Sequence, residues 1–166
     1  MQLNQTTLRG ILAEILSVDQ NHVVPKQGNW WNPQQKGADI ENWCAYRIKR
    51  SVPKTPPFYA ELSEGVGSVA VLKVSVVELQ FVGPLAEQLA QSVAMWALRG
   101  DVKEALAAVR GAIMYENLEA VPSDFYQEGA NTVIAWNVPE LKIMWFDTVE
   151  TNQKPIMTID IGGKIN

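Results

Sequence analysis

The sequence predicts an α+β domain with an antiparallel or mixed sheet of about four to six strands and helices packed on one face. Three observations predict this class. The expected elements run in the order helix, loop, strands, two helices, strands. A long β-branched run over residues 68–82 changes directly into a helical pattern after Gly83 and Pro84. The 166 residues are 47% hydrophobic, which suffices for the core of a single domain spanning residues 1–166.

The first expected element is an amphipathic N-terminal helix over residues 4–18. Its apolar residues recur at helical spacing: Leu8, Ile11, Leu12, Ile15 and Leu16. Candidate N-cap residues stand at its start: Asn4, Thr6 and Thr7. Such a stripe packs on the core of its own domain or docks on a neighbouring subunit, so Leu8 and Ile15 are candidate contact residues. Gly10 costs this helix about 1 kcal/mol relative to alanine.

Residues 19–41 are expected to form a long loop or arm. This segment is rich in Asn and Gln, and Pro and Gly interrupt it repeatedly. Trp30 and Trp31 lie in its middle, and each side chain can bury roughly 150–250 Å². We therefore expect both to be covered, either by their own domain or by a partner, which makes them candidate interface residues.

The α+β core is expected over residues 42–163. It begins with an alternating strand over residues 43–52, which ends at three prolines: Pro53, Pro56 and Pro57. A short extended piece over residues 58–62 and a turn over residues 64–67 follow. These segments predict a hairpin-like excursion ahead of the long strand.

The long strand over residues 68–82 changes its inward face along its length. One parity holds Leu72, Val74 and Val76, and the other holds Val77, Leu79 and Phe81. A bulge or bend near Ser75, Val76 and Val77 would restore the alternation, and so would passage into a second packing environment. At about 3.3 Å per residue the strand spans roughly 50 Å, so part of it is expected to protrude or bend. These three residues are therefore candidate contact residues.

Two helices are expected to follow and to cover the sheet. Gly83 is the expected N-cap of the first and Pro84 its first residue, with an apolar stripe at Leu85, Leu89, Val93, Trp96 and Ala97. Gly100 ends this helix. Asp101 is the expected N-cap of the second, with Glu104 three residues later. Its stripe is Val102, Ala105, Leu106, Val109 and Ile113.

After a loop over residues 115–130, strands are expected at residues 132–138, 141–146 and 155–161. Pro139 separates the first two, and proline cannot donate to an interior ladder. It is therefore expected at an edge, a bulge or a bend. Because exposed edges invite pairing with another chain, Pro139 is also a candidate contact residue.

Composition excludes several classes of function. A net charge of −4 argues against a module that binds nucleic acid. The basic run of Arg47, Lys49, Arg50 and Lys54 is expected on a solvated strand face. The sequence shows neither a signal-peptide pattern nor an apolar run long enough for a membrane helix, so secretion and membrane insertion are not expected.

No catalytic, cofactor-binding or metal-binding residues are predicted. His22 is the only histidine and Cys44 the only cysteine, so neither a disulfide within the chain nor a cysteine-based zinc site can form. The remaining acids with possible relevance carry no spacing signature: Asp39, Glu41, Asp124, Glu128 and Asp147. The protein is therefore not expected to be an enzyme.

Three segments resemble the neck or tail terminator proteins of tailed bacteriophages. They are WCAYRIKRSVP, VAVLKVSVVELQFVGP leading into a helix, and NTVIAWNVPELKIMWF followed by PIMTIDIGG, which together cover roughly residues 43–162. The chain departs from many of these proteins at Gly129-Ala130-Asn131-Thr132, where they carry an Arg-rich entry, and in its Trp30-Trp31 arm.

The resemblance implies a structural virion protein, made in the host cytoplasm and located at the head-proximal end of the tail. Such subunits form a ring, commonly of six copies, which caps the tail tube and joins it to the head-completion complex. The implied partners are other copies, the tail tube, sheath proteins and connector proteins, with DNA only passing through the channel. Two alternatives stay open: another connector, tail-completion or tube subunit, and a small ligand-binding or enzymatic α+β domain.

Overall fold

The structure, a computed structural model, describes residues 2–26, 41–63, 66–116, 118–128 and 131–151. Its helical segments are α1 (Gln5–Leu16), η1 (Gln20–His22), α3 (Ala86–Ser92), η2 (Val93–Leu98) and α4 (Gly100–Ala107). Its strands are β1 (Val23–Pro25), β2 (Trp43–Pro53), β3 (Phe58–Ser63), β4 (Val66–Val82), β5 (Ala112–Ile113), β6 (Val121–Glu128) and β7 (Asn131–Thr151). The predicted α+β class is confirmed.

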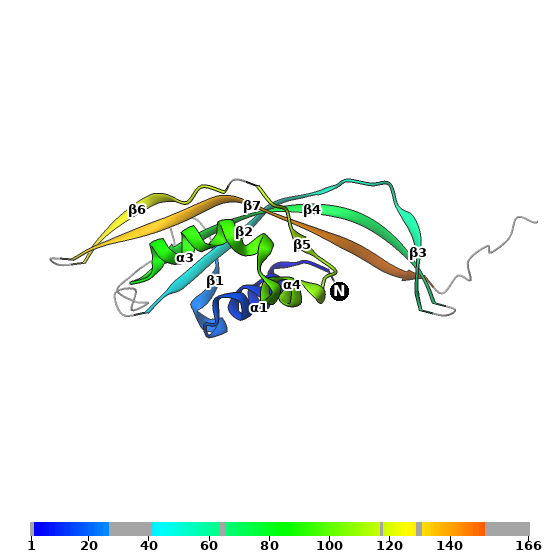
Figure 1. Ribbon diagram of the computed structural model, residues 1–166, viewed down its shortest axis with the longest axis horizontal. Coiled ribbons are helices and arrows are strands. Elements are labelled where there is room, and N and C mark those ends of the chain that lie inside the picture. The colour runs from blue at the N-terminus through cyan, green and yellow to red at the C-terminus, as the bar shows by residue number, and fades with distance from the viewer. Residues whose placement is uncertain (1, 27–40, 64–65, 117, 129–130, 152–166) are drawn as a thin grey trace, which may run out of the picture.

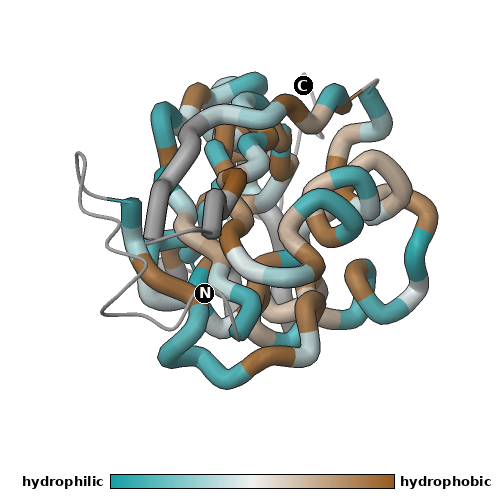
Figure 2. Tube along the Cα trace, turned by 90° about the vertical axis from the view of Figure 1, so that its left-hand side faces the viewer, coloured by the Kyte–Doolittle hydropathy of each residue, from teal (hydrophilic) through white to brown (hydrophobic). Residues whose placement is uncertain are grey.

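The described strands form one mixed sheet of seven, compared with the four to six expected. Its main order is β1-β2-β4-β7-β5, while β3 pairs with β4 and β6 pairs with β7. Among the described strands, only β1 and β2 are parallel neighbours. The helices lie on one face, and the sheet extends past them at both ends (Figure 1). The view along the long axis shows hydrophobic and hydrophilic residues interspersed along the trace, as expected for elements with one buried face (Figure 2).

The N-terminal helix forms as predicted, because its apolar stripe packs on the sheet. Asn4 is its N-cap, and the Asn4 side chain accepts a hydrogen bond from the Thr7 amide at 2.9 Å. The helix ends at Leu16, and Ser17 follows it in the left-handed conformation. Helix and sheet share one core, whose largest fully buried side chains include Trp96, Tyr46, Phe81, Leu8 and Leu12.

Replacing Gly10 with alanine is expected to stabilise the protein by about 0.5–1 kcal/mol. A Cβ at this position would meet only the flexible Gln20 side chain, at an ordinary contact distance of 3.7 Å. Alanine also reduces the backbone freedom of the unfolded chain. Urea denaturation monitored by circular dichroism measures the difference. A lower free energy of unfolding in the variant would contradict the expectation.

Both predicted N-caps after β4 are wrong. The first helix, α3, begins at Ala86 after a turn, and the Asn42 side chain accepts a hydrogen bond from the Leu85 amide at 2.8 Å. At the second helix, α4, the cap position belongs to Arg99. The Asp101 carboxylate pairs with the Arg99 guanidinium instead of capping. This ion pair lowers the pKa of Asp101, chiefly through its hydrogen bond from Arg99.

The expected helical stripes are only partly buried. Val93 and Trp96 are fully buried, but Leu85 is 49% exposed. The second stripe is predicted wrongly at its C-terminal end, because α4 ends at Ala107 and Ile113 belongs to strand β5. Arg110, at a positive φ of 50°, ends the helical path before β5.

Two corrections concern the last strands. The predicted strands at residues 132–138 and 141–146 are one 21-residue strand, β7, which passes through Pro139. The predicted loop over residues 115–130 contains strand β6, which pairs with β7 from Val121 to Glu128. The third predicted strand, at residues 155–161, lies outside the described residues.

Candidate functional site

The predicted bend near Ser75, Val76 and Val77 lies inside the subunit. Their exposed fractions are 0%, 4% and 0%. The Ser75 hydroxyl lies 2.6 Å from the Ser51 hydroxyl and accepts a hydrogen bond from the Trp145 indole at 2.8 Å. Because the chain's own residues fully cover Ser75 and Val77, any part that these two take in a subunit contact is indirect, whereas Val76 lines a groove on the surface of the sheet.

The irregularities that the face change predicted lie on the strands beside β4. Lys49 is an extra residue of β2 between the pairs Ile48 with Val77 and Arg50 with Val76. On the other side, Pro139 and Glu140 of β7 stand against the single residue Glu78. The Lys49 ammonium donates to the Pro139 carbonyl at 3.2 Å. Pro139 therefore occupies a bulge, one of the three placements predicted for it.

The other predicted contact residues fall into two groups. Leu8 is fully buried and Ile15 is 6% exposed, and both belong to the core between the helices and the sheet. The Tyr46 hydroxyl of β2 donates to the Gln5 carbonyl at 2.8 Å, which fixes α1 to the sheet beside them. Trp30 and Trp31 lie outside the described residues, so their role as interface residues stays a prediction.

A nearly buried carboxylate on the face opposite the helices joins β4 to β2 and to the chain that follows β1. Glu78 of β4, 6% exposed, accepts from the Lys26 ammonium at 2.7 Å and from the Arg47 guanidinium at 2.6 Å. Burial alone would raise the pKa of Glu78, but the hydrogen bonds from Lys26 and Arg47 outweigh burial and lower it. The cluster holds the chain that follows β1 against the sheet.

Replacing Glu78 with glutamine is expected to lower the free energy of unfolding by about 1–3 kcal/mol at pH 7, because Lys26 and Arg47 would lose their shared anion. A lowered carboxyl pKa contributes stability at neutral pH, which is lost as the pH falls through the folded-state pKa. Urea denaturation at a series of acid pH values measures the free energy of unfolding of the wild-type protein and of Glu78→Gln. The difference between them should shrink toward low pH, and a difference independent of pH would contradict this assignment.

The described residues include both side chains that the sequence singled out for possible chemistry, His22 and Cys44. No group of three or more His, Cys, Asp or Glu residues within them could hold a metal ion. Cys44 is buried, and burial raises the pKa of its thiol, which keeps it protonated. His22 packs against the Trp43 ring, with ring centroids 4.4 Å apart, and lies 3.3 Å from the Glu41 carboxylate. Among all the described residues, no helix has the length and hydrophobicity that a membrane span requires.

No protein-family model matches the chain, and no curated protein matches it. The exposed surfaces of the molecule are therefore the guide to its function. Three of them stand out, and the sequence patterns indicated none of the three as a site.

The first surface is the distal apolar row, made of Tyr59, Val69 and Val149. These residues are in register across β3, β4 and β7. They lie on the same face of the sheet that, in its middle part, packs against the helices. The helices do not reach this end of the sheet (Figure 1). Tyr59 is 45% exposed and Val149 is 58% exposed. The sequence missed this row because only strand register brings the three residues together.

The second surface is the helical apolar pair, Met95 and Leu98. Both lie on η2, where residues three apart share one side, and they are 55% and 60% exposed. The sequence predicts a regular helix here, with its apolar stripe at Val93, Trp96 and Ala97. The segment is a 3₁₀ helix instead; Trp96 is buried, as the stripe predicts, and Met95 and Leu98 lie in solvent.

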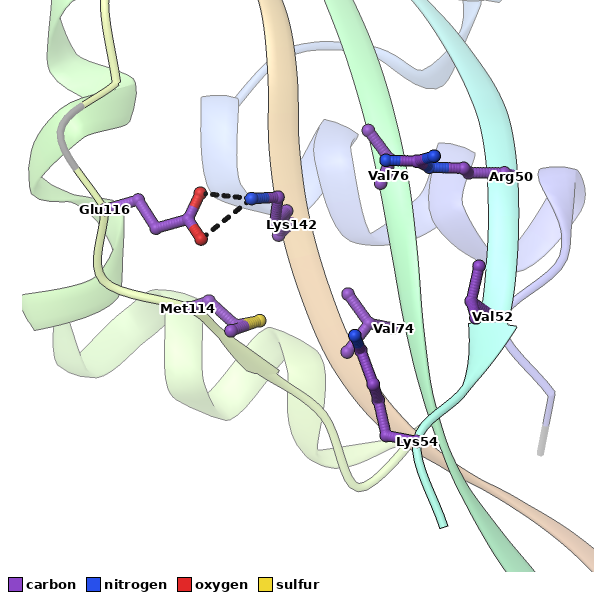
Figure 3. Close-up of a pocket in the computed structure, with 8 residues that line it drawn as sticks. All are labelled: Arg50, Val52, Lys54, Val74, Val76, Met114, Glu116 and Lys142. Atoms are coloured by element: carbon purple, nitrogen blue, oxygen red, sulfur yellow. Dashed lines mark hydrogen bonds and ion pairs between the residues drawn. The ribbon is translucent and has the colours of Figure 1, made fainter. Parts of the chain in front are cut away.

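The third surface is the outer groove, a cavity of about 410 Å³ on the face of the sheet away from the helices. Its lining comes from β2 and Lys54 just after it, from β4 and β7, and from the segment after β5 (Figure 3). On one side, the Lys142 ammonium pairs with the Glu116 carboxylate at 2.9 Å. The basic run predicted for a solvated strand face is divided here. The Arg47 guanidinium pairs with the Glu78 carboxylate, and the Lys49 ammonium donates a hydrogen bond to the Pro139 carbonyl. Arg50 and Lys54 line the groove.

Proposed function

We propose that the protein is a structural subunit of a tailed-phage virion, a tail terminator or neck protein that assembles into a ring, commonly of six copies. In this role it caps the tail tube and joins it to the head-completion complex. The resemblance of the sequence to terminator proteins motivates the proposal. The surfaces of the molecule supply its physical support.

The observation that carries the proposal is a sheet that extends beyond its helices at both ends (Figure 1). A head-to-tail ring needs two different, complementary surfaces on each subunit. The distal apolar row lies at one end of the sheet, and the helical apolar pair lies on the helix layer, so the two surfaces differ in position and shape. The net charge of −4 suits a channel through which DNA slides without binding.

The mass of the purified protein in solution tests the proposal first. Light scattering coupled to size exclusion should give a closed oligomer, and negative-stain images should show a ring with a central hole. A subunit that assembles only on a template would stay monomeric in solution. A second experiment therefore measures binding of the protein to purified tail tubes. A chain that neither forms rings nor binds tubes would contradict the proposal.

Replacing Tyr59 with alanine is expected to weaken assembly at least about tenfold, because a half-exposed tyrosine in an apolar row has the character of an interface anchor. The monomer should keep its fold, since the side chain is 45% exposed. Sedimentation velocity across a concentration series measures the shift in the association constant.

Phe58→Ala provides the matched control. Phe58 precedes Tyr59 on β3, is similarly exposed at 41%, and points to the opposite side of the sheet, where its ring packs edge-on against Phe146. Assembly should survive this change. Equal effects of the two variants on assembly would contradict a contact specific to the helix side.

A further inference from the structure

The distal end of the sheet, beyond the helices, consists of three strands with two open edges (Figure 1). β4 lies in the middle, and β3 pairs only with β4 among the described strands. β7 pairs with β4 as far as Thr151, but on its other side the pairing with β5 stops at Met144. β3 and residues 146–151 of β7 therefore each present one edge that no described strand covers.

These two edges lack the usual protection of an open strand edge. Lysine, proline and bulges keep such edges from pairing in natural sheets. The outer side of β2 beyond β1 has all three, because Lys49 is the extra residue of a bulge and Pro53 ends the strand. β3 and residues 146–151 contain neither lysine nor proline. The Asp147 carboxylate on β7 is already paired with the Lys73 ammonium of its own subunit.

The backbone of β7 directs hydrogen-bonding groups toward its open edge. The Met114 amide donates to the Lys142 carbonyl at 3.0 Å, so the even-numbered residues in this part of β7 direct their backbone groups away from β4. The register with β4 is regular from Leu141 to Thr151. The same direction therefore holds at Thr148, and a strand laid on this edge would complete the ladder.

The distal apolar row reaches both edges. Tyr59 ends it on β3 and Val149 ends it on β7, and both side chains are about half exposed. Both strands are antiparallel to β4, so β3 and β7 run in the same direction. A copy rotated about an axis along the strands therefore offers its β3 in parallel to β7, with its Tyr59 beside Val149. The two edges are the two different, complementary surfaces that a head-to-tail contact needs.

We propose that β3 of one copy pairs in parallel with residues 146–151 of the next copy, with Tyr59 level with Val149. The sheet becomes continuous from subunit to subunit, and the distal apolar row runs unbroken along it. Each copy uses its β3 edge for one neighbour and its β7 edge for the other. The inference rests on the proposed ring and assigns one contact within it, in which the helical apolar pair takes no part.

Cysteine cross-linking tests the partner and the register. With Tyr59 level with Val149, Phe58 lies level with Thr148 on the opposite face, so cysteines at these two positions leave the distal apolar row intact. A mixture of Phe58→Cys and Thr148→Cys chains should form a disulfide-linked dimer under mild oxidation. Neither variant should cross-link alone, because like edges do not meet, and the native Cys44 is buried and should not react. A dimer from one variant alone, or no link in the mixture, would overturn the proposal.

Blocking the β7 edge gives an independent test. Thr148→Pro removes an amide that points to the open edge, while the ladder with β4 keeps its hydrogen bonds. The association constant should fall at least about tenfold, and circular dichroism should show that the fold is retained. Thr148→Val is the matched control, since it keeps the amide and a β-branched side chain, and it should assemble as wild type does.

The outcomes separate this pairing from the ring itself. A wild-type chain that neither forms rings nor binds tail tubes contradicts the ring. Rings or tube-bound assemblies that show no link between Phe58→Cys and Thr148→Cys contradict only the pairing. A folded Thr148→Pro protein that assembles as well as Thr148→Val does the same.

Discussion

Replacing Gly83 with alanine is expected to lower the free energy of unfolding by about 3 kcal/mol or more. Gly83 adopts a φ of +126°, which side chains of L-residues rarely tolerate. An added Cβ would lie 2.3 Å from the Glu41 carbonyl oxygen and 2.8 Å from the Asn42 Cα. Both neighbours are backbone atoms, so they cannot move aside as a flexible side chain would. The variant has to open the junction between β4, α3 and the start of β2.

Gly100→Ala is the matched control, because a Cβ at Gly100 meets nothing within 4 Å. Gly100 is the first residue of α4, and alanine there should leave stability unchanged or slightly higher. Urea denaturation of both variants, followed by far-ultraviolet circular dichroism, measures the two free energies. A Gly83→Ala protein as stable as Gly100→Ala would show that the close approach to Glu41 and Asn42 is absent in solution.

Elements with a strong local pattern could be predicted from the sequence. The apolar stripe and the Asn4 cap indicated α1, and the β-branched run indicated β4. The change of parity at Ser75 to Val77 correctly indicated an irregularity in the sheet. Its position on β2 and β7 could not be predicted, because a bulge depends on how two strands pair.

The errors share a physical cause, which is tertiary contact. Residues 121–128 contain Pro, Ser and Asp and show weak strand character, but pairing with β7 makes them strand β6. The signal that was missed is the two-residue connection Gly129-Ala130, typical of a tight hairpin between Glu128 and Asn131. Pro139 stays within β7 because the bulge removes the need for its missing amide.

The candidate surfaces were beyond the reach of local patterns for the same reason. The distal apolar row exists only because register aligns Tyr59, Val69 and Val149 from three strands. The outer groove likewise gathers residues more than ninety positions apart, such as Arg50 and Lys142. The sequence did supply the basic run that contributes Arg50 and Lys54, although it could not show which of its cations are paired.

Replacing Leu8 with alanine is expected to lower the free energy of unfolding by about 2–5 kcal/mol, the usual cost of a cavity at a fully buried leucine. Leu8 is a candidate for both core packing and subunit contact, and its 0% exposure places it in the core of the isolated chain. Its loss should therefore act first on the stability of the monomer, and assembly should fall only as far as folding does. Thermal and urea denaturation of the variant measure the first effect.

Leu85→Ala is the matched control, because it makes the same change at a leucine that is 49% exposed. It should change stability by only about 0.5 kcal/mol, as most surface substitutions do. The decisive comparison is the association constant measured at a temperature where both variants are fully folded. If Leu8→Ala then assembles as well as wild type, α1 contributes to the ring only by packing on its own sheet. A folded Leu8→Ala protein that fails to assemble would instead assign α1 a direct part in the subunit contact.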